Sequence, residues 1–472
     1  MTALVLATGG LPFPGAGGGT PPTVVRAVPL PLRSLLPVGP GLSLAPDGRL
    51  VAATRSRSRA VRACAPMWAT ALGVVWEQDR GGTVRVGVRL GEGRATLPAE
   101  GGPDPGTAEF RPGAQGTNLL WTGGGRCAVV RLSLPPGTVL AHPRVVFINP
   151  SGTAAGPGTA PPDPTAGLPP ASAATRDPAL VTREEWGADP RLLNCTPDVA
   201  DELRMGFVHH TAGRNDYSRA EADDVVRAIY AYHTNGRGWC DIGYNFLIDR
   251  FGRIYEGRSG GPTLPVVGAA QQGFNTGSFS VSLIGNFETR APPRAAMRAL
   301  RRLLAWRLDV AHLPPKGRTW MTSGGGDNNR FAAGTVVRLP VIAGHRDTGL
   351  TACPGDAVYR RLPGLRDAVA RTGLPKIYRP RLSTTRLTPD VTRLRIRAGA
   401  SGPLTWSVAA FDRSGARVAT FPPATGERLA LTWDGTGDPL PRTPGRYEVR
   451  IRARNGDGER ARPAILPFRV PR

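Results

Sequence analysis

The sequence predicts a multidomain protein in which a central α/β domain, a mixed β-sheet with flanking helices, lies between two β-sandwich-like domains. Three observations support this prediction. The chain has 472 residues, enough for roughly three domains. Apolar residues alternate with polar ones in the first and last parts of the chain, as in half-buried strands. Between them, in residues 179–375, helical periodicity occurs beside short apolar strands, which indicates an α/β domain.

The first part of the chain is predicted to be a leader followed by a small β-domain. Residues 1–44 are rich in glycine and proline, and we expect them to be irregular, starting with an atypical or truncated secretion signal. Residues 45–150 alternate, for example from Leu72 to Trp76, with glycine and proline turns between the apolar runs. Residues 151–178 hold almost no large apolar side chains and are predicted to be a linker.

The central domain, residues 179–375, is predicted from helix and strand signals. A capping box from Ser218 to Glu221 marks the start of one helix. An apolar stripe at helical spacing, which follows the prolines at 292–293, marks a second helix. The expected strands lie between these two helices: 244–248, 254–255 and 281–284.

Residues 376–472 return to alternation. Tyr447, Val449 and Ile451 are predicted to point inward, and the residues between them outward. This part has 19 basic and 8 acidic residues, and therefore carries +11 of the net charge of +24. The predicted sheet would present one strongly basic face.

The net charge of +24 favours a polyanionic partner. Nucleic acid is one class of polyanion, but the chain shows no helix-turn-helix pattern and no interleaving of basic and aromatic residues, so we expect no nucleic-acid binding. An anionic cell-wall polymer or a membrane surface is the other class. No apolar run reaches 18 residues, which excludes an ordinary membrane-spanning helix.

The five cysteines predict two disulfides and one odd cysteine. Cys64 and Cys127 both precede the predicted linker, and Cys195 and Cys240 both follow it. Two bridges within two domains suit an oxidising compartment. Cys353 is the odd cysteine, and no two cysteines have the CxxC spacing of a metal or redox motif.

Two histidines could share a metal ion with the odd cysteine. His209 follows an apolar run, as does His345, so both are expected at strand ends, and Cys353 lies eight residues after the second histidine. Two imidazoles and one thiolate leave a tetrahedral zinc ion with one open position, which is the arrangement of a catalytic site. The spacing alone is weak support, because two histidines and a cysteine also occur by chance.

Seven short motifs follow one another in residues 183–354. They are Arg183–Ala188, Phe207–Ala212, Trp239–Phe246, Gly252–Arg258, Gly273–Thr276, Gly344–Asp347 and Thr351–Pro354. With these motifs in this order, the segment resembles the type 2 N-acetylmuramoyl-L-alanine amidase and peptidoglycan recognition protein family.

The resemblance implies a zinc enzyme that hydrolyses the amide bond between N-acetylmuramic acid and L-alanine of peptidoglycan. Matched by position, the zinc ligands are His209, His345 and Cys353. Tyr244 matches an active-site tyrosine expected to orient water or stabilise the oxyanion. Thr351 is the second expected catalytic residue, acting through a hydrogen bond. We expect a monomer that is secreted or bound to the cell wall and has peptidoglycan as its partner.

A non-catalytic peptidoglycan-binding protein is the alternative. Family members that only bind usually lack the cysteine ligand, so Cys353 argues for catalysis. The alternative stays open because Ala270 follows Gly268-Ala269 where the family often has histidine. His210 and His233 are expected to be structural.

The flanking domains show weaker resemblances. Residues 433–437 and 446–449 resemble the last hairpin of the Ig-like sandwich of flagellar hook-capping proteins, which would make 376–472 such a domain. The segment Gly102–Glu109 resembles part of the extra domain that precedes the amidase in actinobacterial members. These domains are expected either to attach the enzyme to an anionic wall or to act as spacers.

Overall fold

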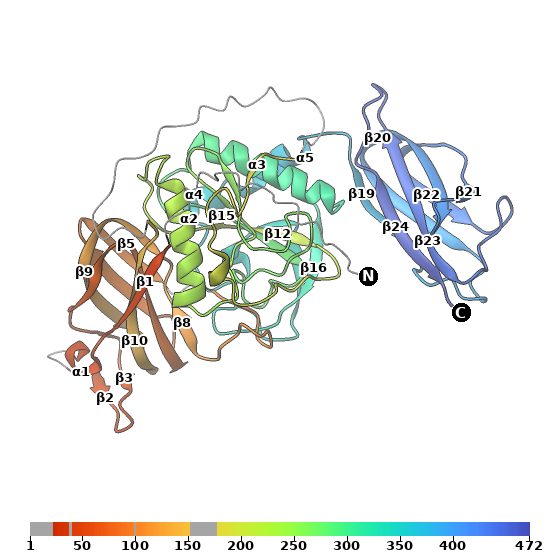
Figure 1. Cartoon of the computed structure of the whole chain (residues 1–472). Helices are drawn as coiled ribbons and strands as arrows, with labels where there is room; N and C mark the ends of the chain where they lie inside the picture. The colour runs from red at the N-terminus through yellow and green to blue at the C-terminus, as the bar shows by residue number, and fades with distance from the viewer. Residues whose placement is uncertain (1–21, 37–39, 99–100, 152–176) are drawn as a thin grey trace, which may run out of the picture.

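The computed structural model describes residues 22–36, 40–98, 101–151 and 177–472. In this part of the chain the strands form three large sheets, in chain order, and one separate hairpin. Figure 1 shows the central sheet and its helices between the first sheet, in red and orange, and the last sheet, in blue. The predicted signal at the start of the chain, and nearly all of the predicted linker, lie outside the described residues.

The first sheet is antiparallel and is built around one long strand, β5 (Val61–Arg80). This strand pairs with both β9 (Leu120–Leu134) and β10 (Thr138–Asn149). Strand β1 (Val24–Pro29) pairs with β10, so the expectation of an irregular segment over residues 1–44 is corrected in its last part. The remaining elements are α1 (Leu32–Leu35), β2 (Leu42–Leu44), β3 (Leu50–Ala52), β4 (Ser56–Arg57), β6 (Arg85–Leu90), β7 (Gly93–Pro98) and β8 (Ala114–Gly116).

The middle of strand β5, from Ala71 to Trp76, is buried on both of its faces, which its alternation did not predict. Leu72 and Val74 point into the core of the first domain. Ala71 and Val75, on the opposite face, pack in a second cluster together with helix α2 (Ala222–Ala231) of the central domain. The first sheet therefore packs against the central domain and shares a core with it.

The central sheet has the strand order β11-β14-β13-β15-β12-β18. Its middle strands are parallel, whereas β13 and β14 are antiparallel, so the sheet is mixed, as predicted. The strands are β11 (Leu180–Val181), β12 (Met205–His210), β13 (Phe246–Ile248), β14 (Ile254–Glu256), β15 (Ser278–Leu283) and β18 (Ile342–Gly344). The separate hairpin is β16 (Arg318–Thr322) with β17 (Val336–Pro340).

Helices cover both faces of the central sheet. Phe246 and Ile248 of β13 pack in the same cluster as α3 (Arg294–Val310) and α5 (Leu362–Ala370). Leu247, between them, packs in the cluster of α2, because successive side chains of a strand point to opposite faces. Parallel strands covered on both sides are expected to be apolar throughout, and all six residues of β12 are buried. A short helix, α4 (Asp356–Tyr359), precedes α5.

The hydrogen bonds of the predicted capping box are present in the turn that leads into α2, which begins at Ala222. The backbone N–H of Ser218 donates to Glu221 Oε2 (2.7 Å), and the N–H of Glu221 donates to Ser218 Oγ (3.3 Å). After α2 the chain continues as one π-helical turn, Tyr232–Gly236. This turn carries His233 and faces the first sheet, where the Tyr232 hydroxyl donates to the Thr117 carbonyl (2.8 Å).

The last sheet is antiparallel, and its alternation follows the prediction. Tyr447, Val449 and Ile451 are buried, and the residues between them are more exposed. The strands are β19 (Ile377–Leu382), β20 (Leu394–Asp412), β21 (Arg417–Thr420), β22 (Ala424–Trp433), β23 (Gly445–Arg454) and β24 (Ala464–Val470). Within the described residues, helices are either too short or too polar to cross a membrane.

Candidate metal centre and its surroundings

The two histidines lie at the same edge of the central sheet. Strands β12 and β18 are parallel neighbours in which Val208 is paired with Gly344, so His209 and His345 follow that pair side by side. Cys353 reaches them from the loop before α4. One ligand atom from each of the three residues lies within 4.8 Å of the other two, and the residues are only 1%, 5% and 6% exposed. The structure thus brings together the three residues predicted to bind zinc.

The chemistry of this cluster fits a zinc ion. The Nε2 atom of His209 is buried and has no hydrogen-bond partner among the described residues. Burial, and then the charges of His345 and His210, hold the pKa of His209 well below its usual value, which favours the neutral imidazole that a metal requires. The backbone N–H of His210 donates to Cys353 Sγ (3.3 Å), which stabilises a thiolate. Two nitrogens and one sulfur could hold a tetrahedral zinc ion with one open position.

Tyr244 lies beside the cluster. Its ring centre is 5.5 Å from that of His209 and 5.6 Å from that of His233. His233 accepts a hydrogen bond at Nδ1 from the backbone N–H of Gly243 (3.0 Å). His233 therefore supports the loop that presents Tyr244, in keeping with the structural role expected for it.

Thr351 and His210 serve the backbone around the cluster. Thr351 Oγ1 accepts from the backbone N–H of Cys353 (3.1 Å), so this hydroxyl fixes the cysteine loop, and its catalytic role stays a prediction. His210 accepts at Nδ1 from the N–H of Phe287 (3.2 Å). Burial lowers the pKa of His210 to about 3, so this histidine is neutral and structural.

Both predicted disulfides are present. Cys64 and Cys127 join β5 to β9 at positions that are directly paired. Cys195 and Cys240 join the segment before β12 to the loop before Tyr244. The second bridge therefore restrains the chain on the way to the candidate site.

Residues 101–109 of the first domain lie against the candidate site, which no sequence pattern predicts. The segment Gly102–Glu109 resembles part of a known domain type, but nothing in its composition indicates where it packs. Gly101 lies so close to His345 that an added Cβ would be 3.4 Å from the ring atoms Cε1 and Nε2. Asp104 accepts hydrogen bonds from the turn that starts at Gly273.

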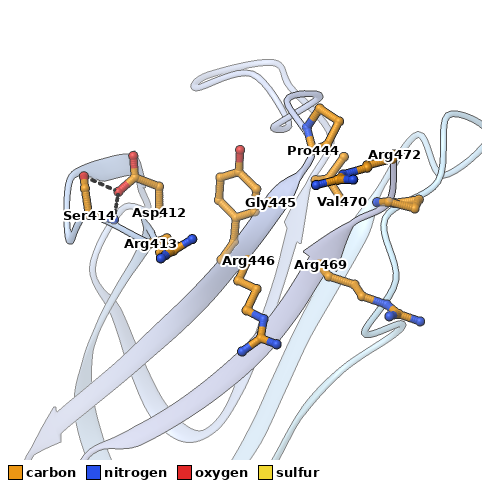
Figure 2. Close-up of a pocket in the computed structure, with 11 residues that line it drawn as sticks. Asp412, Arg413, Ser414, Pro444, Gly445, Arg446, Arg469, Val470 and Arg472 are labelled. Carbon is orange, nitrogen blue, oxygen red and sulfur yellow. Dashed lines mark hydrogen bonds between the residues drawn. The ribbon is translucent and has the colours of Figure 1, made fainter.

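A second feature is a basic hollow of about 1050 Å³ on the last sheet. Figure 2 shows four arginines around it: Arg413, Arg446, Arg469 and Arg472. Within the described part of the chain none of the four forms an ion pair. The one acidic residue in the lining, Asp412, accepts from the N–H and the hydroxyl of Ser414.

Two arginines of this hollow lie directly opposite each other on neighbouring strands. Arg446 of β23 is paired directly with Arg469 of β24. The backbone of Arg469 also forms an isolated β-bridge with that of Arg386. Like charges directly opposite on neighbouring strands destabilise a sheet.

The fold and the cluster define an α/β domain with a candidate zinc centre, and comparison with known proteins assigns its family. The family model described as N-acetylmuramoyl-L-alanine amidase matches residues 200–356. Peptidoglycan-recognition protein SC2 of Drosophila simulans is 30% identical over 183 residues, which are 39% of this chain and 84% of that protein. Peptidoglycan recognition protein 1 of Bos taurus is 33% identical over 184 residues, 39% of this chain and 81% of that protein.

The chain therefore belongs to the type 2 N-acetylmuramoyl-L-alanine amidase and peptidoglycan recognition protein family. Among solved structures, that of Drosophila peptidoglycan recognition protein SD has 29% identity and a TM-score of 0.30, and the match covers 39% of this chain and 91% of that one. The residues matched by the family model lie within the central domain.

Proposed function

We propose that this protein is a zinc-dependent N-acetylmuramoyl-L-alanine amidase that hydrolyses the bond between muramic acid and L-alanine in peptidoglycan. The observation that carries the proposal is the buried cluster of His209, His345 and Cys353, whose ligand atoms lie within 4.8 Å of one another. A purely binding protein has no need of a buried thiol beside two buried histidines. A non-catalytic receptor for peptidoglycan is the alternative function.

The residues around the cluster would each have a definite role in hydrolysis. His209, His345 and Cys353 would hold a zinc ion, which supplies Lewis-acid chemistry for amide hydrolysis. Tyr244, 3% exposed, would place its hydroxyl towards the developing oxyanion or the attacking water. Thr351 would keep the cysteine loop in position and could donate its hydroxyl proton in a hydrogen bond to the substrate.

The last sheet is proposed to hold the enzyme on an anionic wall polymer. The support is the hollow lined by four arginines, in which Arg446 and Arg469 are placed directly opposite each other. Bidentate guanidinium groups match the oxygens of a phosphate better than ammonium groups do. Two disulfides, with Cα–Cα distances of 3.9 and 5.2 Å, support an oxidising location such as the cell wall.

The test of the amidase is digestion of purified peptidoglycan by the zinc-loaded protein, with and without a chelator. The expected products are stem peptides with a free N-terminal L-alanine, and chelation should abolish them. If the protein binds peptidoglycan but releases no such peptides, the receptor alternative is correct. If the peptides appear equally after zinc removal, the zinc assignment is wrong.

Cys353→Ser tests the ligand set. The variant should lose both bound zinc, measured by elemental analysis, and hydrolysis, because a neutral hydroxyl is a poor replacement for a thiolate. His233→Gln is the matched control, since His233 lies close by but is assigned a structural role. Full zinc content in the Cys353→Ser variant would contradict the proposed site.

A further inference from the structure

Residues 101–109 run along the edge of the candidate site, and their first two residues pack closely against it. The backbone of Gly101 lies against the ring of His345 and the carbonyl of Ala270, which an added Cβ would approach to 3.4 and 3.2 Å. Arg237 donates to the Gly101 carbonyl (3.3 Å). Gly102 lies on the indole ring of Trp239, where an added Cβ would be 3.5 Å from Cζ2. This segment, which we call the strap, is buried from residue 101 to residue 104.

One carboxylate anchors the strap to the turn after Ala270. Asp104 Oδ1 accepts from the backbone N–H of Gly273 and from Asn275 Nδ2, both at 2.6 Å, and Oδ2 accepts from the N–H of Thr276 (3.3 Å). Asn275 Nδ2 also donates to the Gly102 carbonyl (3.2 Å). Charged acceptors make the stronger hydrogen bonds, so this end of the strap is firmly held.

A second carboxylate anchors the other end of the strap beside the loop of Tyr244. Glu109 forms an ion pair with Arg258, and the two side chains are 11% and 2% exposed. Glu109 Oε2 also accepts from the backbone N–H of Cys240 (2.9 Å). The strap thus crosses the candidate site between two anchors on segments of the central domain that carry family motifs. The orange chain before β8 runs along the central domain in Figure 1.

We propose that the strap is an intramolecular inhibitor, which occupies the edge of the histidine–cysteine site and has to leave before a peptidoglycan strand can bind. This inference rests on the proposed function for its biological meaning. A scissile amide must reach the ligand residues, yet these are at most 6% exposed. A site that is open for only a fraction of the time has its apparent affinity reduced by that fraction.

Gly101→Leu is the sharpest test, because it changes no residue of the central domain and leaves both anchors in place. A Cβ alone would already be 3.2 Å from the Ala270 carbonyl and 3.4 Å from the His345 ring, so the larger leucine side chain should displace the strap. Ala108→Leu places the same leucine side chain at an exposed position of the same strap and is the matched control. The double variant Asp104→Ala/Glu109→Ala, which removes both anchors, is an independent second route to release.

The primary measurement is the rate at which iodoacetamide alkylates Cys353 in metal-free, unreduced protein, followed by intact mass. The other four cysteines are in disulfides, so a single label reports this thiol. Gly101→Leu and the double variant should react at least about tenfold faster than the wild type and Ala108→Leu, as expected if the docked state dominates. Circular dichroism identifies a variant that is merely unfolded.

Hydrolysis by the zinc-loaded variants separates the strap proposal from the function proposal. If alkylation is faster and stem-peptide release rises, both stand. If alkylation is faster but no variant releases stem peptides, the strap stands and the amidase fails. If alkylation of a folded Gly101→Leu variant matches the wild type, the strap proposal is overturned whatever the activity.

Discussion

At the scale of single residues, the residues of the candidate site could be predicted from the sequence. The hydrogen bonds that hold those residues in place could not. His209, His345 and Cys353 were found because motifs and strand ends are local features of the sequence. The hydrogen bond from the His210 backbone to Cys353 Sγ, and that from Gly243 to His233, join residues whose proximity depends on the complete fold. No local pattern encodes them.

Tyr244→Phe should reduce the rate of hydrolysis without affecting zinc. The phenol ring packs beside His209 and His233, and phenylalanine preserves that packing while removing the hydroxyl. Loss of one donor to an oxyanion typically costs about 10²–10³ in kcat. Steady-state kinetics and zinc content measured on the same sample would test this, and an unchanged kcat would remove Tyr244 from the catalytic residues.

At the scale of elements, the strands and helices were predictable from periodicity, but the way they pack together was not. The alternation from Leu72 to Trp76 predicted one buried face, and the structure buries both, because α2 and the π-helical turn cover the second face. Ala71 and Val75 are apolar, but single small apolar residues are also common on exposed strand surfaces. Their presence in the sequence therefore does not indicate a domain interface.

Gly73→Ala should destabilise this interface. Gly73 lies under the ring of Tyr232, and an added Cβ would be 2.3 Å from ring atoms Cε2 and Cζ. Overpacking of this kind costs about 1–3 kcal/mol, which thermal unfolding would detect. Gly87→Ala is the control, since its Cβ would meet nothing closer than 3.6 Å.

The same interface predicts coupling between Gly73 and Tyr232. Adding Tyr232→Leu to Gly73→Ala should cost less than the sum of the two single changes, because the smaller side chain removes the clash. Strict additivity would show that the ring and the glycine are not in contact in solution.

At the scale of the whole molecule, a buried lysine joins the central and last domains. Lys376 precedes β19 and is fully buried, and its Nζ donates to the carbonyl of Ala305 in α3 (3.1 Å). Burial lowers the pKa of Lys376 to about 8 from 10.5, against the opposing charge of Asp309. Below pH 8 the amine is charged in both the folded and the unfolded states. The whole free-energy cost of burying the charge then opposes folding.

Lys376→Met should therefore stabilise the protein at pH 7, and the gain should shrink as the pH rises. Between pH 8 and about 10 the folded wild type loses its proton while the unfolded chain keeps it, so wild-type stability rises with pH. The pKa difference corresponds to about 3 kcal/mol at neutral pH. Denaturant unfolding at pH 7, 8, 9 and 10 measures it, and a difference that is independent of pH would contradict the assignment.

The arginines of residues 376–472 can be counted in the sequence, but their arrangement in space cannot be read from it. Arg446 and Arg469 are 23 residues apart in the chain and become direct partners only when β23 pairs with β24. Arg446→Ser/Arg469→Ser should weaken binding to inorganic polyphosphate several-fold at low salt, with a smaller effect at high salt because of screening. The variant should be at least as stable as the wild type, because a like-charge pair is removed.

The matched control is Arg395→Ser/Arg428→Ser, which removes the same charge from two exposed positions of the same sheet, away from the hollow. Binding measured by fluorescence anisotropy should separate the two variants. If both weaken polyphosphate binding equally, net charge alone drives the attraction and the hollow is not a site. If only the Arg446/Arg469 variant does so, the opposed arginines are a phosphate-binding site, kept despite their repulsion because a polyanion neutralises it on binding.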